Sequence, residues 1–427
     1  MPEKIMPNNR SKSQLKRDVK LVIAILLVII LLGLLAFLNS RVAGYGGHWE
    51  VTDFMEIYLG GRTLLEGGDL YNPVEWEKFH QKYAKSYLNN PIFIYPLPAA
   101  FVFAPFALFP VQMGAVVWLL VNEVLLIVLI SYTIRHTKMR SNMPALLSMA
   151  LIIGVYLPTI LVIGSGQYSA FMLILILSVY LFLKADIDWA AGFCFALLCN
   201  RPNPILLVFP LLLVWAIFNR RYQFIWSSLL SGLALLALSL WISPDWINTW
   251  LYFTIGDSGK INSYGLTSQT LRGLMFDLGS GLSYSIQVAL LWGISLLTIL
   301  IAVLVVIRKR DFRLDTLMAL AVTISLCISP YAWNYDHMIL LFPMLFILLR
   351  GENGSQKNRL LAWIGVIFVY MLLPYVIRYI EMIQYIFTLT IIVPYVVLAL
   401  QLWVINSIPS AQPTDQRSLQ SVHMSVS

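Results

Sequence analysis

Asp53 is the first residue whose type and place in the chain could do chemistry. It stands in the run Thr52-Asp53-Phe54-Met55-Glu56, shortly after the first apolar segment. A carboxylate held over a membrane groove could take a proton from a substrate hydroxyl, as a general base does. The same run predicts the start of a helix, with Thr52 or Asp53 as N-cap and Glu56 completing a capping box. Capping and catalysis are compatible, because a helix N-terminus can keep a carboxylate ionised.

Three cations stand in polar segments that separate apolar ones. Arg201 belongs to Asn200-Arg201-Pro202-Asn203-Pro204, and Lys260 and Arg272 belong to segment 243–281. Arg201 either grips an anionic phosphate through paired hydrogen bonds or is an interfacial arginine in a Pro-rich turn. Lys260 and Arg272 are either phosphate contacts or cations of a solvated loop.

Asp336 and His337 stand side by side where a late apolar segment begins, after the run Ser329-Pro330-Tyr331-Ala332-Trp333. Asp336 could cap the helix that follows, and His337 could be an ordinary interfacial histidine. A buried pair of this kind could instead bind sugar hydroxyls or shuttle protons.

Two other acidic features are weaker. Asp186-Ile187-Asp188 spells the acidic triplet with which soluble nucleotide-sugar transferases bind metal, but it is a short turn with no nucleotide-binding domain around it. Glu123 follows Asn122 in the middle of segment 113–134. An acidic residue inside a membrane span suggests a functional role. Packing of that helix through hydrogen bonds is the alternative. We predict no metal site and no cofactor, since no P-loop, Rossmann fingerprint, HExxH or nucleophile elbow is present.

Composition determines which elements must position these residues. The 427 residues are 59% hydrophobic and 12% charged, with a mean hydropathy of +0.77. That excludes a soluble domain, which needs far more charge to cover its surface. The net charge of +8 lies in short clusters between apolar segments, which predicts membrane topology and no nucleic-acid partner. Cys194, Cys199 and Cys327 all lie in apolar segments and predict buried thiols.

The apolar segments predict an all-α polytopic membrane protein with about 12 transmembrane helices. Each crossing needs about 20 residues. The predicted spans are 21–40, 113–134, 145–163, 168–184, 188–200, 204–218, 222–242, 282–307, 313–329, 336–350, 360–377 and 384–406. Alternating them places every basic cluster and both termini in the cytoplasm.

This topology predicts three regions along the chain. Residues 1–20 form a basic cytoplasmic N-terminus, 21–406 a single membrane-embedded domain, and 407–427 a polar, disordered cytoplasmic tail. The large outer loops are 41–95 and 243–281. The Pro-rich segment 96–110 is too short to cross and is predicted to be interfacial or re-entrant.

The first outer loop is predicted to carry interfacial helices. One begins at Thr52 or Asp53, ends at Gly67-Gly68, and lies with its apolar face on the membrane surface. A second segment places four aromatic residues at the interface: Trp76, Phe79, Tyr83 and Tyr87.

Several short motifs, in a shared order, resemble glycosyltransferase family 87. This family has the GT-C fold and includes polyprenol-phosphate-mannose-dependent mannosyltransferases. The matching residues are Thr52-Asp53-Phe54, Gly60 to Tyr71, Tyr95-Pro96-Leu97-Pro98, Ala104 to Pro110, Gly166-Gln167, Ala191-Gly192, Arg201-Pro202 with Pro204, Ser268-Gln269-Thr270-Leu271 with Gly273, and Ser329-Pro330 with Trp333. The resemblance covers about residues 45–350.

The resemblance implies an inverting transfer of a sugar, mannose or another hexose, from a polyprenyl phosphate to a glycolipid or glycan acceptor. The reaction would occur on the extracytoplasmic face of the plasma membrane, with Asp53 as the base. Arg201, Lys260 and Arg272 would hold the donor phosphate. Substrate contacts are expected at Arg62, Tyr95, Gln167, Gln269, Asp336 and His337. The family often has histidines after the Trp333 position, so either Asp336 or His337 fills that place.

Two other functions compete with sugar transfer. A transporter or flippase for a lipid-linked sugar would need paired broken helices and often internal repeats, and no repeat is visible in the sequence. A polymerase or ligase for lipid-linked sugars would need several outer arginines, and the predicted outer segments contain few.

Overall fold

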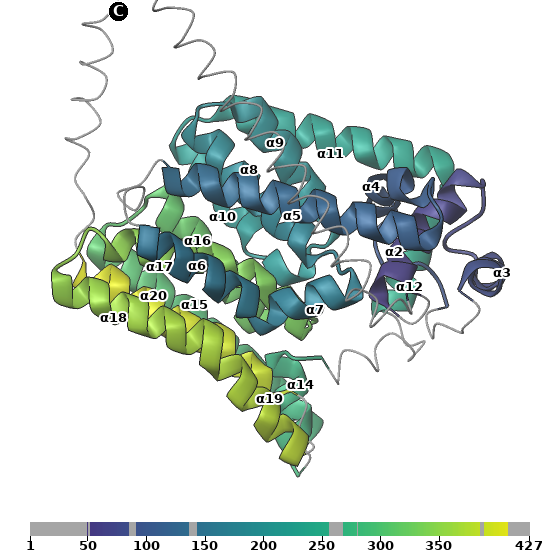
Figure 1. The fold of residues 1–427 in the computed structure, drawn as a ribbon. Helices are drawn as coiled ribbons and strands as arrows, with labels where there is room; N and C mark the ends of the chain where they lie inside the picture. The colour runs from purple at the N-terminus through teal and green to yellow at the C-terminus, as the bar shows by residue number, and fades with distance from the viewer. Residues whose placement is uncertain are drawn as a thin grey trace, which may run out of the picture.

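The computed structural model describes residues 49, 52–84, 91–135, 143–255, 268–279, 281–384 and 388–408. Within these ranges every regular element is a helix and no strand occurs, which confirms the predicted all-α class. Figure 1 shows the longer helices lying roughly alongside one another, with α2, α3 and α12 gathered at one end of the bundle. The predicted first span at 21–40 and the tail from 409 onward lie outside the described residues.

The N-terminal half of the described chain contains ten α-helices and two short 3₁₀ helices. Their bounds are α2 Asp53–Leu65, α3 Pro73–Tyr83, α4 Pro98–Ala107, α5 Val111–Arg135, α6 Met143–Val155, α7 Leu157–Ser165, α8 Ser169–Lys184, α9 Asp188–Leu197, η3 Leu198–Asn200, η4 Asn203–Ile205, α10 Val208–Phe218 and α11 Tyr222–Ile242.

The C-terminal half begins with α12 and α14 and continues through the last apolar helices. Their bounds are α12 Trp246–Ile255, α14 Leu271–Leu278, α15 Tyr284–Lys309, α16 Leu314–Ile328, η5 Asn334–Leu340, α17 Leu341–Gly351, α18 Gln356–Ile367, η6 Phe368–Leu372, α19 Leu373–Gln384, η7 Leu389–Ile391 and α20 Ile392–Ser407. The element η6 is a π-helical turn that joins α18 to α19.

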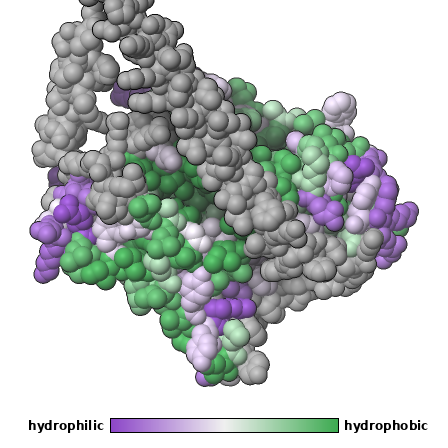
Figure 2. Space-filling view, viewed as in Figure 1, coloured by the Kyte–Doolittle hydropathy of each residue, from purple (hydrophilic) through white to green (hydrophobic). Residues whose placement is uncertain are grey.

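Several helices are long and apolar enough to cross a membrane. Five described stretches meet this criterion, and a sixth does if the bent pair α6 and α7 counts as one span. Helix α15 exposes Trp292, Leu296 and Leu300. Figure 2 shows hydrophobic side chains over the middle of the visible face and hydrophilic ones toward its left and right ends. These features are those of a membrane protein, whereas the number of twelve spans stays a prediction.

Other apolar helices are too short to cross a bilayer by themselves. Helix α8 has 16 residues, α16 has 15 and α10 has 11. At 1.5 Å per residue they measure about 24, 22 and 16 Å, against a hydrocarbon core of about 30 Å. Breaks at both ends of these helices leave backbone groups and polar side chains free to form a site inside the bundle.

The first outer helix differs from its prediction in two ways. No side chain caps α2, because the Thr52 hydroxyl donates to the Trp49 carbonyl (2.8 Å) instead. Glu56 forms no capping box but is buried and faces His80, with 3.8 Å between carboxylate and imidazole. The expected surface position is also wrong, since α3, α4 and α5 pack around α2 and bury most of it.

Helix α4 covers α2 at a close approach that glycine permits. A Cβ on Gly61 would lie 2.7 Å from the backbone carbonyl carbon of Phe103, and one on Gly60 would lie 2.4 Å from the Phe93 ring. Helix α4 spans ten residues, about 15 Å, and so is too short for a crossing. The Pro-rich segment 96–110 packs on protein through α4, and its interfacial or re-entrant placement stays a prediction.

Ion pairs explain two acidic features at other helix ends. Arg221 pairs with Asp186 and with Asp188 (3.3 Å), so both acids of the triplet have a partner within the chain. Buried Arg350 pairs with Asp311 and donates to the Ile408 carbonyl (3.0 Å), which joins three helix ends. These clusters hold the bundle together and need no ligand.

The contact between α2 and α4 generates a stability prediction. A Gly61→Val substitution should lower the thermal stability of the detergent-purified protein by about 1–3 kcal/mol, because the new side chain meets the α4 backbone. Gly232→Val is the matched control, since no atom lies within 4 Å of the Cβ position at Gly232. Equal melting temperatures for the two variants would contradict the packing assigned to Gly61.

Candidate functional site

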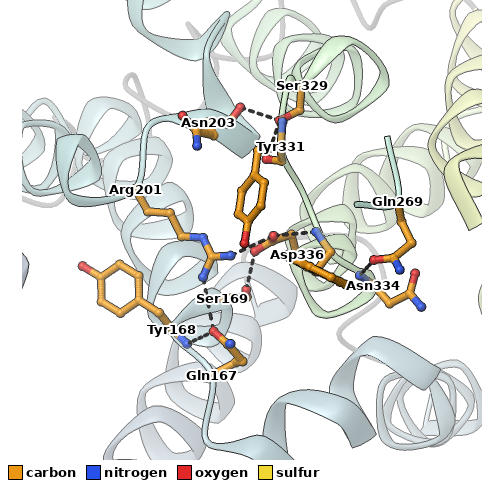
Figure 3. Close-up of polar contacts among 11 residues, drawn as sticks. Gln167, Tyr168, Ser169, Arg201, Asn203, Gln269, Ser329, Tyr331, Asn334 and Asp336 are labelled. Atoms are coloured by element: carbon orange, nitrogen blue, oxygen red, sulfur yellow. Dashed lines mark hydrogen bonds and ion pairs between the residues drawn. The ribbon is translucent and has the colours of Figure 1, made fainter. Parts of the chain in front are cut away.

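A buried ion pair joins two segments that are far apart in the sequence. Arg201 lies between η3 and η4, and Asp336 lies in the first turn of η5. The Arg201 guanidinium donates to the Asp336 carboxylate at 2.8 Å, and the two side chains are 8% and 1% exposed. Figure 3 shows this pair at the centre of a larger polar network. Both residues were predicted as site residues, but their pairing was not predicted.

The guanidinium of Arg201 is held on its edge and on its faces. Its second terminal nitrogen donates to the side-chain oxygen of Gln167 at 3.2 Å. The Tyr95 ring lies 5.7 Å away and the Tyr335 ring 5.4 Å away, both within cation–π range. Arg201 is thus a fixed internal charge, where the sequence left open an interfacial arginine.

The Asp336 carboxylate accepts two further hydrogen bonds. One oxygen accepts from the Ser169 hydroxyl at 2.8 Å, and the other accepts from the backbone N–H of Trp333 at 2.9 Å. The bond to Trp333 confirms the predicted capping role, although the capped element is the 3₁₀ helix η5. Charge-assisted bonds of this kind fix the position of a carboxylate.

Prolines and a serine hydroxyl set the local backbone around Arg201. Pro202 and Pro204 follow Arg201, and a proline removes a backbone donor and disfavours a regular helix. The Ser329 hydroxyl contacts the Asn203 carbonyl at 3.1 Å and so joins the end of α16 to η4. Arg201 therefore sits in a break between helices, where its side chain turns inward.

Gln167 occupies the tight turn between α7 and α8. Gly166 ends α7 in the left-handed conformation (φ +68°), and a Cβ there would lie 2.7 Å from that of Phe54. The Trp118 indole donates to the Gly166 carbonyl at 3.0 Å. Glycine lets this turn approach α2 closely, and the approach brings Gln167 to Asp53.

Asp53 begins α2 and exposes part of its surface. Desolvation of the carboxylate by the surrounding protein raises the pKa of Asp53 above its ordinary value of 3.8, the Gln167 side chain and Arg201 lower it, and Asp336 raises it. A carboxyl group with a raised pKa is better suited to proton transfer near neutral pH.

Aromatic side chains surround the polar network. Tyr95 and Tyr168 lie 6.1 Å apart between ring centroids, and Tyr168 stacks on Trp118 at 6.3 Å. Burial raises the pKa of Tyr331 to about 12, so its phenol stays neutral. Neutral phenols and rings of this kind offer hydrogen bonds and apolar faces, the groups that sugars contact.

Segment 243–281, predicted to be an outer loop, contributes Gln269 and Arg272. The Gln269 side-chain oxygen accepts from the backbone N–H of Asn334 at 3.1 Å, two residues before Asp336. Thr270 caps α14 by accepting from the Gly273 N–H, and Arg272 follows in the first turn of that helix. Arg272 is half-buried and forms no hydrogen bond or ion pair within the described parts of the chain.

Two predicted residues that the structure describes, Arg62 and His337, are not part of the polar network. Arg62 contacts Glu66, the Tyr83 hydroxyl and the Ala107 carbonyl, so its bonds join α2, α3 and α4. His337 is 1% exposed, and neither ring nitrogen has a hydrogen-bond partner among the described residues. Lys260 lies outside the described residues.

Sequence reasoning missed Ser169 and Tyr335. Ser169 follows a turn in an apolar segment, and Tyr335 was seen only as a neighbour of Asp336. No sequence signal connects either residue to the ion pair, because Ser169 meets Asp336 and Tyr335 meets Arg201 across more than 100 positions of chain. Across the described ranges no three His, Cys, Asp or Glu residues gather as they would around a metal ion.

Breaking the Arg201–Asp336 pair should be costly, because each partner is buried. Arg201→Gln and Asp336→Asn should each lower the free energy of unfolding by about 3–5 kcal/mol. The double variant should lose less unfolding free energy than the two single variants do together, since it leaves no buried charge without a partner. Thermal unfolding of the four detergent-purified proteins completes this cycle. Strict additivity would show that the two charges do not interact.

The comparisons with known proteins bear on the region that contains this network. A family model described as glycosyltransferase family 87 matches residues 93–330, more than half of the chain. The matched region includes Gln167, Arg201 and Gln269, whereas Asp53 and Asp336 lie outside it. No match was found among curated proteins or among solved structures.

Proposed function

Because the chain belongs to glycosyltransferase family 87, we propose that it transfers a hexose from a polyprenyl phosphate to a lipid-linked or glycan acceptor. Transfer occurs on the extracytoplasmic face of the membrane. One observation carries the proposal: the turn that holds Gln167 packs on Phe54, the neighbour of Asp53, and so brings Asp53 near the buried Arg201–Asp336 pair. The arrangement supplies a carboxylate with a raised pKa next to fixed charge and aromatic rings.

The proposed reaction uses Asp53 as the general base. As an acceptor oxygen attacks the anomeric carbon, its O–H bond breaks and the proton moves to the Asp53 carboxylate. A new bond forms between the acceptor oxygen and the anomeric carbon. The bond from that carbon to the phosphate oxygen breaks, and its electron pair stays on the polyprenyl phosphate. Attack opposite the leaving group inverts the anomeric configuration.

The leaving phosphate needs positive charge, and the two described arginines differ in what they offer. Arg201 is already paired with Asp336, so the pair together carries little net charge. Arg272 is half-buried without such a partner in the described ranges, so its full charge can face the phosphate. We assign Arg272 the direct phosphate contact and Arg201 the electrostatic support. Lys260 remains a further phosphate ligand in this proposal.

An apolar cavity supports a lipid-linked donor. Helices α10, α15 and α16 enclose about 730 Å³ between side chains such as Leu207, Leu211, Val303 and Ile324. Leu207 lies six positions after Arg201, and its N–H donates to Ser325 on α16 at 2.9 Å. The cavity therefore begins beside the segment that holds Arg201, where the tail of a lipid with its phosphate at the site would pass.

The base assignment is tested by Asp53→Asn. Transfer from polyprenyl-phosphate sugars to crude lipid acceptors should fall by about 10²–10⁴-fold, because the amide cannot take the hydroxyl proton. Asp69→Asn, an exposed acid of the same outer segment, is the matched control and should keep full activity. A thermal melt of each purified protein shows whether it is folded. Normal turnover by folded Asp53→Asn protein would overturn the base assignment.

Filling the apolar cavity tests the donor. Val303→Trp should lower transfer from long-chain polyprenyl-phosphate sugars by about tenfold or more, because the indole occupies the space of the tail. Sugars on a short-chain isoprenyl phosphate should still react. Leu300→Trp is the control, since Leu300 is 53% exposed on the same helix and does not line the cavity. If Val303→Trp lowered the transfer rate equally for long-chain and short-chain donors, or did not lower it at all, the cavity would not be the binding site of the donor tail.

A further inference from the structure

Helix α14 is a short helix that is held by segments from three other parts of the chain. It has eight residues and carries Arg272 in its first turn. At its N-terminal end the Gln269 side-chain oxygen accepts from the backbone N–H of Asn334 at 3.1 Å, which joins α14 to η5. At its C-terminal end the Gln287 amide donates to the Gly279 carbonyl at 2.7 Å, which joins it to α15. A helix this short is not stable by itself, so contacts such as these decide where it lies.

The third contact comes from the turn η7, which precedes α20. The Thr388 hydroxyl donates to the Asp277 carboxylate at 2.6 Å, across 111 positions of the chain. Thr388 is 0% exposed, whereas Asp277 keeps exposed surface. Figure 1 shows α14 and α19 at the lower edge of the bundle. A hydroxyl that donates to a carboxylate forms a short, charge-assisted bond, which is stronger than a bond between neutral groups.

The turn that carries Thr388 is itself fixed by a buried acid. One oxygen of the Glu381 carboxylate, on α19, accepts from the backbone N–H of Thr390 at 2.9 Å and from the Thr390 hydroxyl at 2.6 Å. The other oxygen accepts from Arg378 at 3.2 Å, and Glu381 is 0% exposed. The turn cannot move away from α14 without breaking bonds of a buried carboxylate, which is costly.

We propose that Thr388 is a positioning residue for the donor phosphate: its bond to Asp277 fixes α14, and α14 holds Arg272 at the phosphate. This inference rests on the proposed phosphate contact of Arg272. Both Arg272 and Asp277 belong to the same eight-residue helix, so a helix held at one is held at the other. A displacement of about 1 Å is enough to weaken a directed contact. Thr388 lies outside the region that the family model matches, so the inference extends the site to the C-terminal helices.

A positioning bond and a purely structural bond differ in what their loss changes. Loss of a structural bond lowers the fraction of folded protein and leaves the affinity of the folded protein for every ligand as it was. Loss of the bond between Thr388 and Asp277 should instead weaken binding of a lipid that carries a phosphate. The same lipid without the phosphate does not need Arg272, so its binding should not change.

The test measures the Kd of polyprenyl phosphate and of uncharged polyprenol for the detergent-purified, full-length protein. Thr388→Val removes the hydroxyl and keeps the shape of the side chain. It should raise the Kd for polyprenyl phosphate by about 3- to 10-fold, the effect expected when one hydrogen bond no longer holds the helix. The Kd for polyprenol should stay the same. Thr388→Ser keeps the hydroxyl and should bind polyprenyl phosphate like the parent protein.

Two further variants show whether Thr388 acts through α14. Asp277→Ala removes the same bond from its exposed side, so adding Thr388→Val to it should raise the Kd for polyprenyl phosphate no further. Arg272→Gln removes the phosphate contact itself. In that background Thr388→Val should have no effect on the same Kd, because there is no cation left for α14 to position.

Thr323→Val is the matched control. Thr323 is also 0% exposed, but its hydroxyl donates to the Ala319 carbonyl at 3.0 Å within α16, and it does not line the apolar cavity. Its loss should leave the Kd of both lipids unchanged. A thermal melt shows whether each variant is folded.

A folded Thr388→Val protein that binds polyprenyl phosphate like the parent, or that loses affinity for both lipids equally, would overturn the inference. The proposed phosphate contact fails separately, and the inference with it, if Arg272→Gln leaves the Kd for polyprenyl phosphate unchanged. The proposed donor fails if the parent protein binds polyprenyl phosphate no more tightly than polyprenol.

Discussion

The buried ion pair between Arg201 and Asp336 is the interaction on which the candidate site depends. A guanidinium and a carboxylate at 8% and 1% exposure are stable only if each satisfies the other. The pair sets where η5 lies relative to the η3–η4 break, and Ser169 joins α8 to it through a third bond. Three segments from distant parts of the chain meet at this one contact.

Short helices make room for that contact. The elements that end at the network are too short to cross a bilayer, so their ends fall inside the bundle and leave polar groups there. Longer helices such as α5 and α15 extend beside them and present apolar surface. A buried polar network is therefore possible in a largely apolar protein, because each member finds a partner from another broken helix.

The structure gives different surroundings to charged residues that look equivalent in the sequence. Arg201 and Arg272 are both cations of polar segments, but among the described residues only Arg201 has a buried partner. Asp53 and Glu56 are both acids in the first turn of α2. Asp53 lies near enough to Arg201 and Asp336 for both to shift its pKa, whereas Glu56 turns toward His80 on α3. Pairing and burial, more than residue type, determine which group remains available for chemistry.

The sequence by itself determined the all-α class and the family, because apolar segment length and short ordered motifs are local properties. It also singled out Gln167, Arg201 and Asp336, which the structure brings together, while their roles stay predictions. The tertiary structure alone decided that Arg201 pairs with Asp336, that Ser169 donates to Asp336, and that α2 is buried under α4. The first two depend on contacts between residues more than 100 positions apart, and the third on glycines that permit close approach. Local sequence patterns do not indicate which helix ends, distant in the sequence, will come into contact.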